Sequence, residues 1–195
     1  MAATLTAQTT FYEGSSPTVT VASGERIIVV LRERDGSAMS VSSSLDGALT
    51  QVVTRSAVIG RASIFYLQNP TVGSHTLTIS GGTVRDGNAM VWAGLQNAAA
   101  DTSNSASNSS TTSHAHGAIT PSATALIITA FASGDHGGVT PNTGFSALSI
   151  DVNGVNSRQY YAYKTSHTGS ITPTHTSTNS TSTDACCAAF LETAA

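Results

Sequence analysis

The chain has few charged side chains. Its 195 residues include only 8 basic and 11 acidic ones, for a net charge of −3, whereas about a quarter of the residues in a soluble domain are charged. The arginines are scattered, so no basic patch for nucleic-acid phosphates is expected. Disorder is not expected either, because hydrophobic residues make up 39% of the chain and the net charge is low.

Cysteine and long apolar runs are also scarce. The two cysteines, Cys186 and Cys187, are adjacent, and a bridge between sequence neighbours is strained and closes almost no loop. We predict two small hydrophobic side chains in a terminal strand, one on each face. No apolar run reaches the roughly 18 residues of a membrane helix, and residues 1–6 lack the basic and apolar regions of a signal peptide. We therefore expect no membrane partner.

Serine and threonine are abundant, with 57 residues between them. Apolar and β-branched runs recur between turn residues every 8–12 positions, which favours strands over helices. We predict one all-β domain over residues 1–195, an antiparallel, jelly-roll-like β-sandwich of about nine or ten strands. Residues 1–12 are a possible N-terminal arm, and no clear internal repeat stands out. The clearest strand signals are at 26–32, 62–67, 75–79, 88–95, 122–132 and 185–191.

Two polar tracts, 97–117 and 165–183, carry no core pattern. A structureless loop of about 20 residues is unusual inside a compact domain. Tract 97–117 is therefore a functional surface loop, an extended edge segment or a piece ordered by a neighbouring chain. We expect both tracts to lie as strands across a neighbouring subunit and to be ordered only where that neighbour covers them.

His114 and His116 are the candidate metal ligands. In a strand, residues i and i+2 face the same way, so both imidazoles can reach one ion. Asp101, His136 or copies of the pair in a trimer would complete the site. The alternative is a pair of solvent-facing histidines in a polar edge segment. We predict that the chain holds no metal and no other cofactor.

Catalytic patterns are weak, and we predict that the chain is not an enzyme. No Gly-x-Ser-x-Gly elbow is present, and Asp135 and His136 lie in a glycine-rich loop that is typical of a solvated turn. Tyr160, Tyr161 and Tyr163 either form a sugar-stacking platform or pack across strands. These five residues are the candidate contacts for a partner.

One stretch resembles a known group of proteins. Residues 64–79 contain Tyr-Leu-Gln-Asn-Pro, a turn at glycine and then His-Thr-Leu-Thr-Ile. This segment, with 89–96 and 185–191 after it, resembles β-sandwich proteins associated with phages and prophages. The resemblance implies a module of a virion or its appendage and carries over no functional residues.

We therefore expect a phage structural protein on the capsid surface. It would decorate or cement the capsid by binding the major capsid protein at capsomer junctions. It would also bind itself as a homo-oligomer, most simply a trimer. A hydroxyl-rich surface with few long charged side chains loses little rotamer entropy on packing. The alternative is a tail-fibre or receptor-binding tip that recognises host glycans through residues 134–144 and 160–163.

Overall fold

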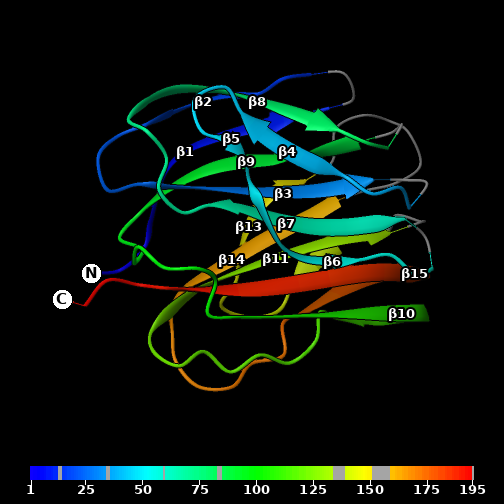
Figure 1. The fold of residues 1–195 in the computed structure, drawn as a ribbon. Helices are drawn as coiled ribbons and strands as arrows, with labels where there is room; N and C mark the ends of the chain where they lie inside the picture. Colours follow the sequence, from blue (N-terminus) through cyan, green and yellow to red (C-terminus); the bar gives the residue numbers. More distant parts are fainter. Residues whose placement is uncertain are drawn as a thin grey trace.

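The computed structural model describes residues 1–12, 15–33, 36–58, 60–82, 85–133, 139–150 and 159–194. These residues form fifteen strands and no helix (Figure 1). It follows that no helix in the described ranges is long and apolar enough to cross a membrane. The predicted all-β, antiparallel, sandwich-like fold is confirmed, although the strands outnumber the nine or ten expected.

The centre of the molecule is a five-stranded antiparallel sheet in the order β1-β9-β3-β7-β6. Its middle strand, β3, is buried at every residue, which explains why its centre, residues 27–31, is a continuous apolar run rather than an alternating one. The strands are β1 (Thr4–Phe11), β9 (Arg85–Ala93), β3 (Arg26–Glu33), β7 (Arg61–Leu67) and β6 (Thr50–Arg55).

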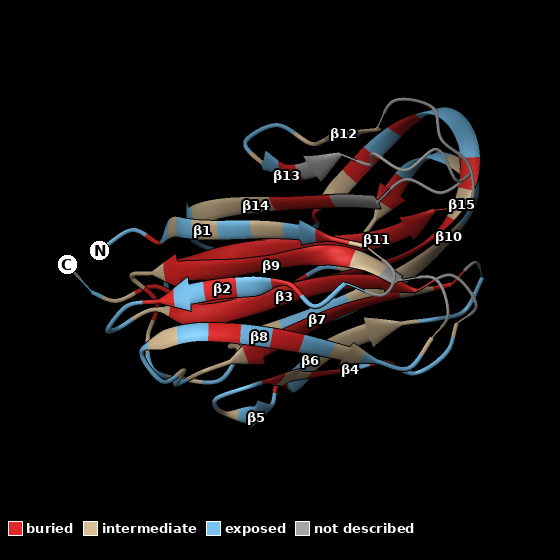
Figure 2. Cartoon of the chain, turned by 90° about the horizontal axis from the view of Figure 1, so that it is seen from above, coloured by how far each residue is buried: buried red, intermediate tan, exposed pale blue. Residues whose placement is uncertain are grey.

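Two further sheets cover the central one, one on each face (Figure 2). The first cover, a four-stranded sheet, contains β2 (Thr18–Val21), β8 (Gly73–Ser80), β4 (Ser40–Ser43) and β5 (Gly47–Ala48). The second sheet contains, in order, β10 (Thr102–Ala115), β15 (Thr174–Leu191), β11 (Ala125–Ser133), β14 (Gln159–His167) and β13 (Ser146–Ile150). A short strand, β12 (Val139–Pro141), pairs with β15 beside this order.

The central and second sheets repeat one topology. In both, the strand order runs first, fifth, second, fourth and third along the chain segment that forms the sheet. The registers match as well. Ile28 of β3 pairs with Met90 and Tyr66, and Ile128 of β11 pairs with Ala188 and Tyr163. The sequence shows no clear repeat because most matched positions keep their burial and not their residue type.

Aromatic contacts between the two sheets follow the same relation. Trp92 packs edge-on against Tyr163 with ring centroids 5.1 Å apart. Tyr66 packs against Phe190 at 4.8 Å. Trp92 and Phe190 occupy matching positions in the two sheets, as do Tyr66 and Tyr163. The same two positions are therefore in contact twice, with the sheets exchanged. This exchange is what a two-fold relation between the sheets requires.

The two cysteines lie in β15 as predicted. Both are free and buried, Cys186 in the core shared with the central sheet and Cys187 in the cluster on the opposite face. Burial raises the pKa of the Cys187 thiol to about 12, which keeps it protonated. They are small hydrophobic side chains, one on each face of the strand.

The expectation that the polar tracts need a neighbour is wrong. Most of tract 97–117 is β10, and much of tract 165–183 is the first half of β15. The two pair with each other from Thr102 opposite Ala189 to Ala115 opposite Thr174. The partner strand satisfies their backbone groups, so the tracts are ordered within one chain. At the N-terminus, β1 pairs with β9 of the same chain from Thr4 to Phe11.

Candidate functional site

The ribbon formed by β10 and β15 bends back on itself. The Asn108 side chain donates to the Ala115 carbonyl at 3.0 Å and accepts from the Ala115 N–H at 3.1 Å. Asn104 likewise reaches the Ala118 carbonyl at 2.8 Å. Such contacts along one strand need a reversal, and Ser110 has a left-handed φ of 46°. We call the bent part, residues 109–119 with 171–182, the arch; Figure 2 shows the ribbon curling at one end of the molecule.

Three histidines lie under the arch. His114, His116 and His175 have 0%, 0% and 1% of their surface exposed. All three rings surround Phe131 of β11, at centroid distances of 6.2, 5.9 and 5.0 Å. The expected alternative to metal binding, two solvent-facing histidines, is therefore wrong, because the reversal turns that face inward onto the second sheet.

Hydrogen bonds within the protein occupy both ring nitrogens of His114 and of His116. His114 bonds Ser177 Oγ through Nε2 at 2.8 Å and Thr183 Oγ1 through Nδ1 at 3.2 Å. His116 Nδ1 donates to the Cys186 carbonyl at 3.1 Å, which leaves its Nε2 to accept from His175 Nδ1. This chain of bonds suits neutral imidazoles.

Burial gives the cluster its electrostatic character. Desolvation lowers the pKa of His116 to about 4, and it also lowers the pKa of His114 and of His175. In the part of the chain that the structure describes, no three His, Cys, Asp or Glu side chains are grouped to hold a metal ion. His114 and His116 come together as predicted, and the geometry gives them a hydrogen-bonding role.

Sequence reasoning missed His175 as a member of this cluster. Its segment alternates buried Pro173, His175 and Ser177 with less buried threonines. That period of two was visible as the threonines at 172, 174, 176 and 178. It could have marked a strand with an inward-facing histidine, had the tract been interpreted as part of the sheet.

The free edges of two strands, β6 and β10, lie on one side of the sandwich. Each ends its sheet, and Arg55 of β6 donates through Nε to Ser107 Oγ of β10 at 2.7 Å. We call this side the β6/β10 edge. A groove of about 390 Å³ opens along it, lined by Thr50, Gln51, Val52, Ala99, Ala100, Asp101, Thr102 and Ser103.

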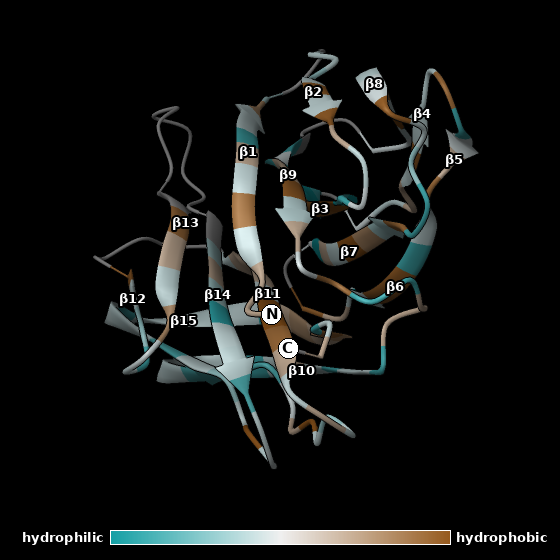
Figure 3. Cartoon of the chain, turned by 90° about the vertical axis from the view of Figure 1, so that its left-hand side faces the viewer, coloured by the Kyte–Doolittle hydropathy of each residue, from teal (hydrophilic) through white to brown (hydrophobic). Residues whose placement is uncertain are grey.

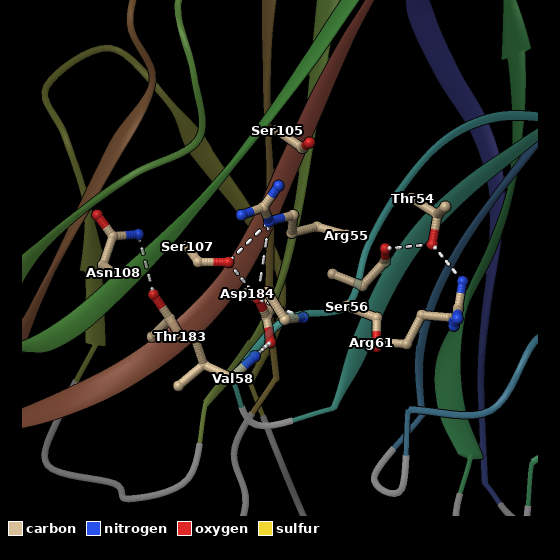
Figure 4. Close-up of polar contacts among 12 residues, drawn as sticks. Thr54, Arg55, Ser56, Val58, Arg61, Ser105, Ser107, Asn108, Thr183 and Asp184 are labelled. Carbon is tan, nitrogen blue, oxygen red and sulfur yellow. Dashed lines mark hydrogen bonds and ion pairs between the residues drawn. The ribbon is translucent and has the colours of Figure 1, made fainter.

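A buried carboxylate holds the end of this edge together (Figure 4). Asp184 of β15 is fully buried and accepts from the backbone N–H of Ala57 at 3.2 Å and of Val58 at 2.9 Å. It also accepts from Ser107 Oγ and lies 3.9 Å from Arg55 Nε. The segment after β6 is thus tied to the second sheet, and the Arg55 charge is compensated inside the protein.

The outer side of β10 offers backbone groups to another strand. The Ser105 N–H donates to Asn104 Oδ1 of its own strand at 2.8 Å instead of to β15. Since N–H groups alternate in direction along a strand, those of Ser103 and Ser107 face the same free edge. β10 contains no charged residue and no proline, which are the usual devices that protect an edge from pairing.

The remaining predicted contact residues do not gather at this edge. Tyr161 is 1% exposed and donates to the Asp86 carbonyl at 3.2 Å, so a surface stacking role does not fit it. Tyr163 packs on Trp92, and Tyr160 pairs with Phe131 through the backbone. Asp135 and His136 lie outside the described residues.

The chain has no match among protein families, curated proteins or solved structures.

Proposed function

We propose that the chain is a structural protein of a phage virion that decorates the capsid. It binds the major capsid protein at capsomer junctions, and its contact is the β6/β10 edge, which pairs with an extended segment of the capsid protein. It acts without catalysis. As a homo-oligomer, most simply a trimer, it bridges neighbouring capsomers through several weak contacts at once.

The free outer edge of β10 is the observation that carries this proposal. Its stretch from Thr102 to Asn108 lies next to a groove and contains only serine, threonine, asparagine and alanine. Main-chain hydrogen bonds supply the affinity in strand addition, and small side chains let a second strand approach. The absence of charge on β10 removes the repulsion that would oppose dense packing on a lattice.

The resemblance of residues 64–79 to phage sandwich proteins points to the same setting. In the structure this segment begins in β7, ends in β8 and contributes Leu77 to the core under the first cover. It thus belongs to the scaffold. This position agrees with the resemblance, which implies a fold and assigns no contact residues.

The test uses purified protein and phage heads that lack it. We expect the protein to co-sediment with these heads in a saturable way and to raise the temperature at which they release their contents. Failure to bind and to stabilise heads would overturn the proposal. Binding to host cells or to host glycans in place of heads would also contradict it and favour the tail-tip alternative.

A further inference from the structure

The arch is the part of the molecule most unlike an ordinary sandwich cover. Its inner side brings three histidines against Phe131, while its outer turn is an exposed run of serine, threonine and asparagine. The proposed function uses neither the histidines nor the turn. Histidines titrate near neutral pH, so a buried histidine cluster between a two-stranded flap and a sheet can make the position of the flap depend on pH.

We propose that the arch is an acid-sensitive flap that closes over the second sheet while His114, His116 and His175 are neutral and opens when they gain protons. The bond between His116 Nε2 and His175 Nδ1 needs one nitrogen that accepts. A protonated imidazole has two donors and no acceptor, so a second proton on His116 removes this bond. The backbone carbonyl of Cys186 already takes the other donor.

The surroundings give a protonated histidine little compensation. From β10 the cluster is faced by His114 and His116, and from β15 by His175, Ser177, Thr183, the Cys187 thiol and the Cys186 carbonyl. From β11 it is faced by Phe131. Asp184 is the nearest carboxylate in sequence on β15, but it points to Ala57 and Val58. Asp135 and His136 lie outside the described residues.

Among the described side chains, the other histidines add to the effect of burial on the pKa values of His116 and His175. The charges of His116 and His114 lower the pKa of His175, and that of His114 lowers the pKa of His116. A first proton therefore makes the next one more costly in the closed state. Opening exposes all three to water and removes both the desolvation and the mutual repulsion, so acid favours the open form.

The sign of the effect follows from linkage. Histidine has an ordinary pKa of 6.5, and His116 under the closed arch has one of about 4. The open state therefore binds more protons as the pH falls below about 6.5, and the closed arch loses stability. Between about pH 7 and pH 5, His116 alone favours opening by about twenty-fold. The arch behaves in this way whether or not the chain binds a capsid.

Hydrogen–deuterium exchange at the two pH values tests this proposal. With rates corrected for intrinsic exchange, we expect about twenty-fold faster exchange in residues 109–119 and 171–177 near pH 5. Strand β3 of the central sheet is buried and contains no histidine, so it is the internal reference and should not change. Arch protection that is equal at both pH values would overturn the proposal. An equal loss in β3 would overturn it too, because it would indicate global unfolding.

Two variants sharpen the result. His116→Gln removes the group with the lowered pKa and should reduce the pH dependence of arch exchange, whatever its protection at neutral pH. His167→Gln is the matched control, because His167 lies on β14 opposite Ala125, at the other end of β11 from Phe131. It should keep the full pH dependence. The opposite pattern in the two variants would contradict the assignment to the cluster.

Discussion

The central and second sheets have the same strand order and the same pairing register, yet their outer faces are covered differently. Over the central sheet lies a four-stranded sheet whose contacts are apolar, with Val19, Val41 and Leu77 packed against Val29 and Phe65. Over the second sheet lies the arch, whose contacts with the sheet around Phe131 are histidines, serine and threonine. One topology therefore supports two kinds of cover.

The difference indicates which cover stabilises the fold and which one responds to a change in pH. Apolar burial is non-directional and does not depend on pH. A cover made of hydrogen bonds between buried imidazoles and hydroxyls is directional and contributes only about 1 kcal/mol per bond. We infer that the first cover contributes more to the stability of the fold than the arch does, and that the arch is the part that can open without unfolding the rest.

Two aspartates at matching positions show the same contrast. Asp86 lies opposite Arg32 in the central sheet, and Asp184 lies opposite Ala132 in the second. Asp86 forms an ion pair with Arg32 at 3.7 Å, and its side chain is 16% exposed. Asp184 is fully buried and fixes the segment after β6 through two backbone N–H groups. Of the two matched aspartates, Asp184 is therefore the one that connects the second sheet to the central sheet.

Shortening a side chain in the first cover should have the largest effect. Leu77→Ala removes a fully buried side chain of β8 and should lower the free energy of unfolding by about 2–5 kcal/mol through lost transfer energy and a cavity. Urea denaturation followed by Trp92 fluorescence measures this. The fold should remain two-state. A loss below about 1 kcal/mol would mean that this cover is not the stabilising one.

Removing the buried carboxylate should come next. Asp184→Ala leaves Arg55 without its counter-charge, and Ser107 and two backbone N–H groups without their acceptor, so it should cost about 3 kcal/mol. Asp86→Ala is the matched change in the other sheet and should cost less than half as much, because its carboxylate is partly exposed. Equal losses in the two variants, measured by urea denaturation, would remove the distinction between these positions.

Cutting the tie within the arch should have a smaller effect. Asn108→Ala removes two hydrogen bonds to Ala115 and one to Thr183. We expect about 1–2 kcal/mol less protection in residues 109–119, with β8 and β3 unaffected in a hydrogen-exchange experiment at neutral pH. If protection fell equally in β3, the arch would be part of the cooperative core and not a separate flap.

Sequence patterns predicted the elements that contact the core. The runs at 27–31 in β3 and 125–128 in β11 are apolar. The alternation of His75, Leu77 and Ile79 placed His75 on the buried side, where it bonds Ser43 Oγ. The free, two-faced cysteines were equally predictable. Each of these depends on side chains a few residues apart, which a pattern of period two describes well.

Patterns of this kind could not predict β10 or the arch, and the reason is physical. β10 carries no apolar alternation, since its stability comes from pairing with β15, about 60–90 residues away in the sequence. The arch also depends on long-range contacts, such as Phe131 with His175. The sequence repeat is hidden because matched positions, such as Asn88 and Cys186, share burial but not chemistry.

The most direct test of the proposed function compares two substitutions of Ser103 in a head-binding assay. Ser103→Pro removes both the hydroxyl and the outward N–H, whereas Ser103→Ala removes only the hydroxyl. Proline is tolerated where an edge N–H faces solvent, so both variants should fold, as circular dichroism can verify. The account predicts that Ser103→Ala binds heads as the parent protein does and that Ser103→Pro binds at least ten-fold more weakly, as the loss of about 1.4 kcal/mol requires. Equal binding by the two folded variants would contradict strand addition at β10.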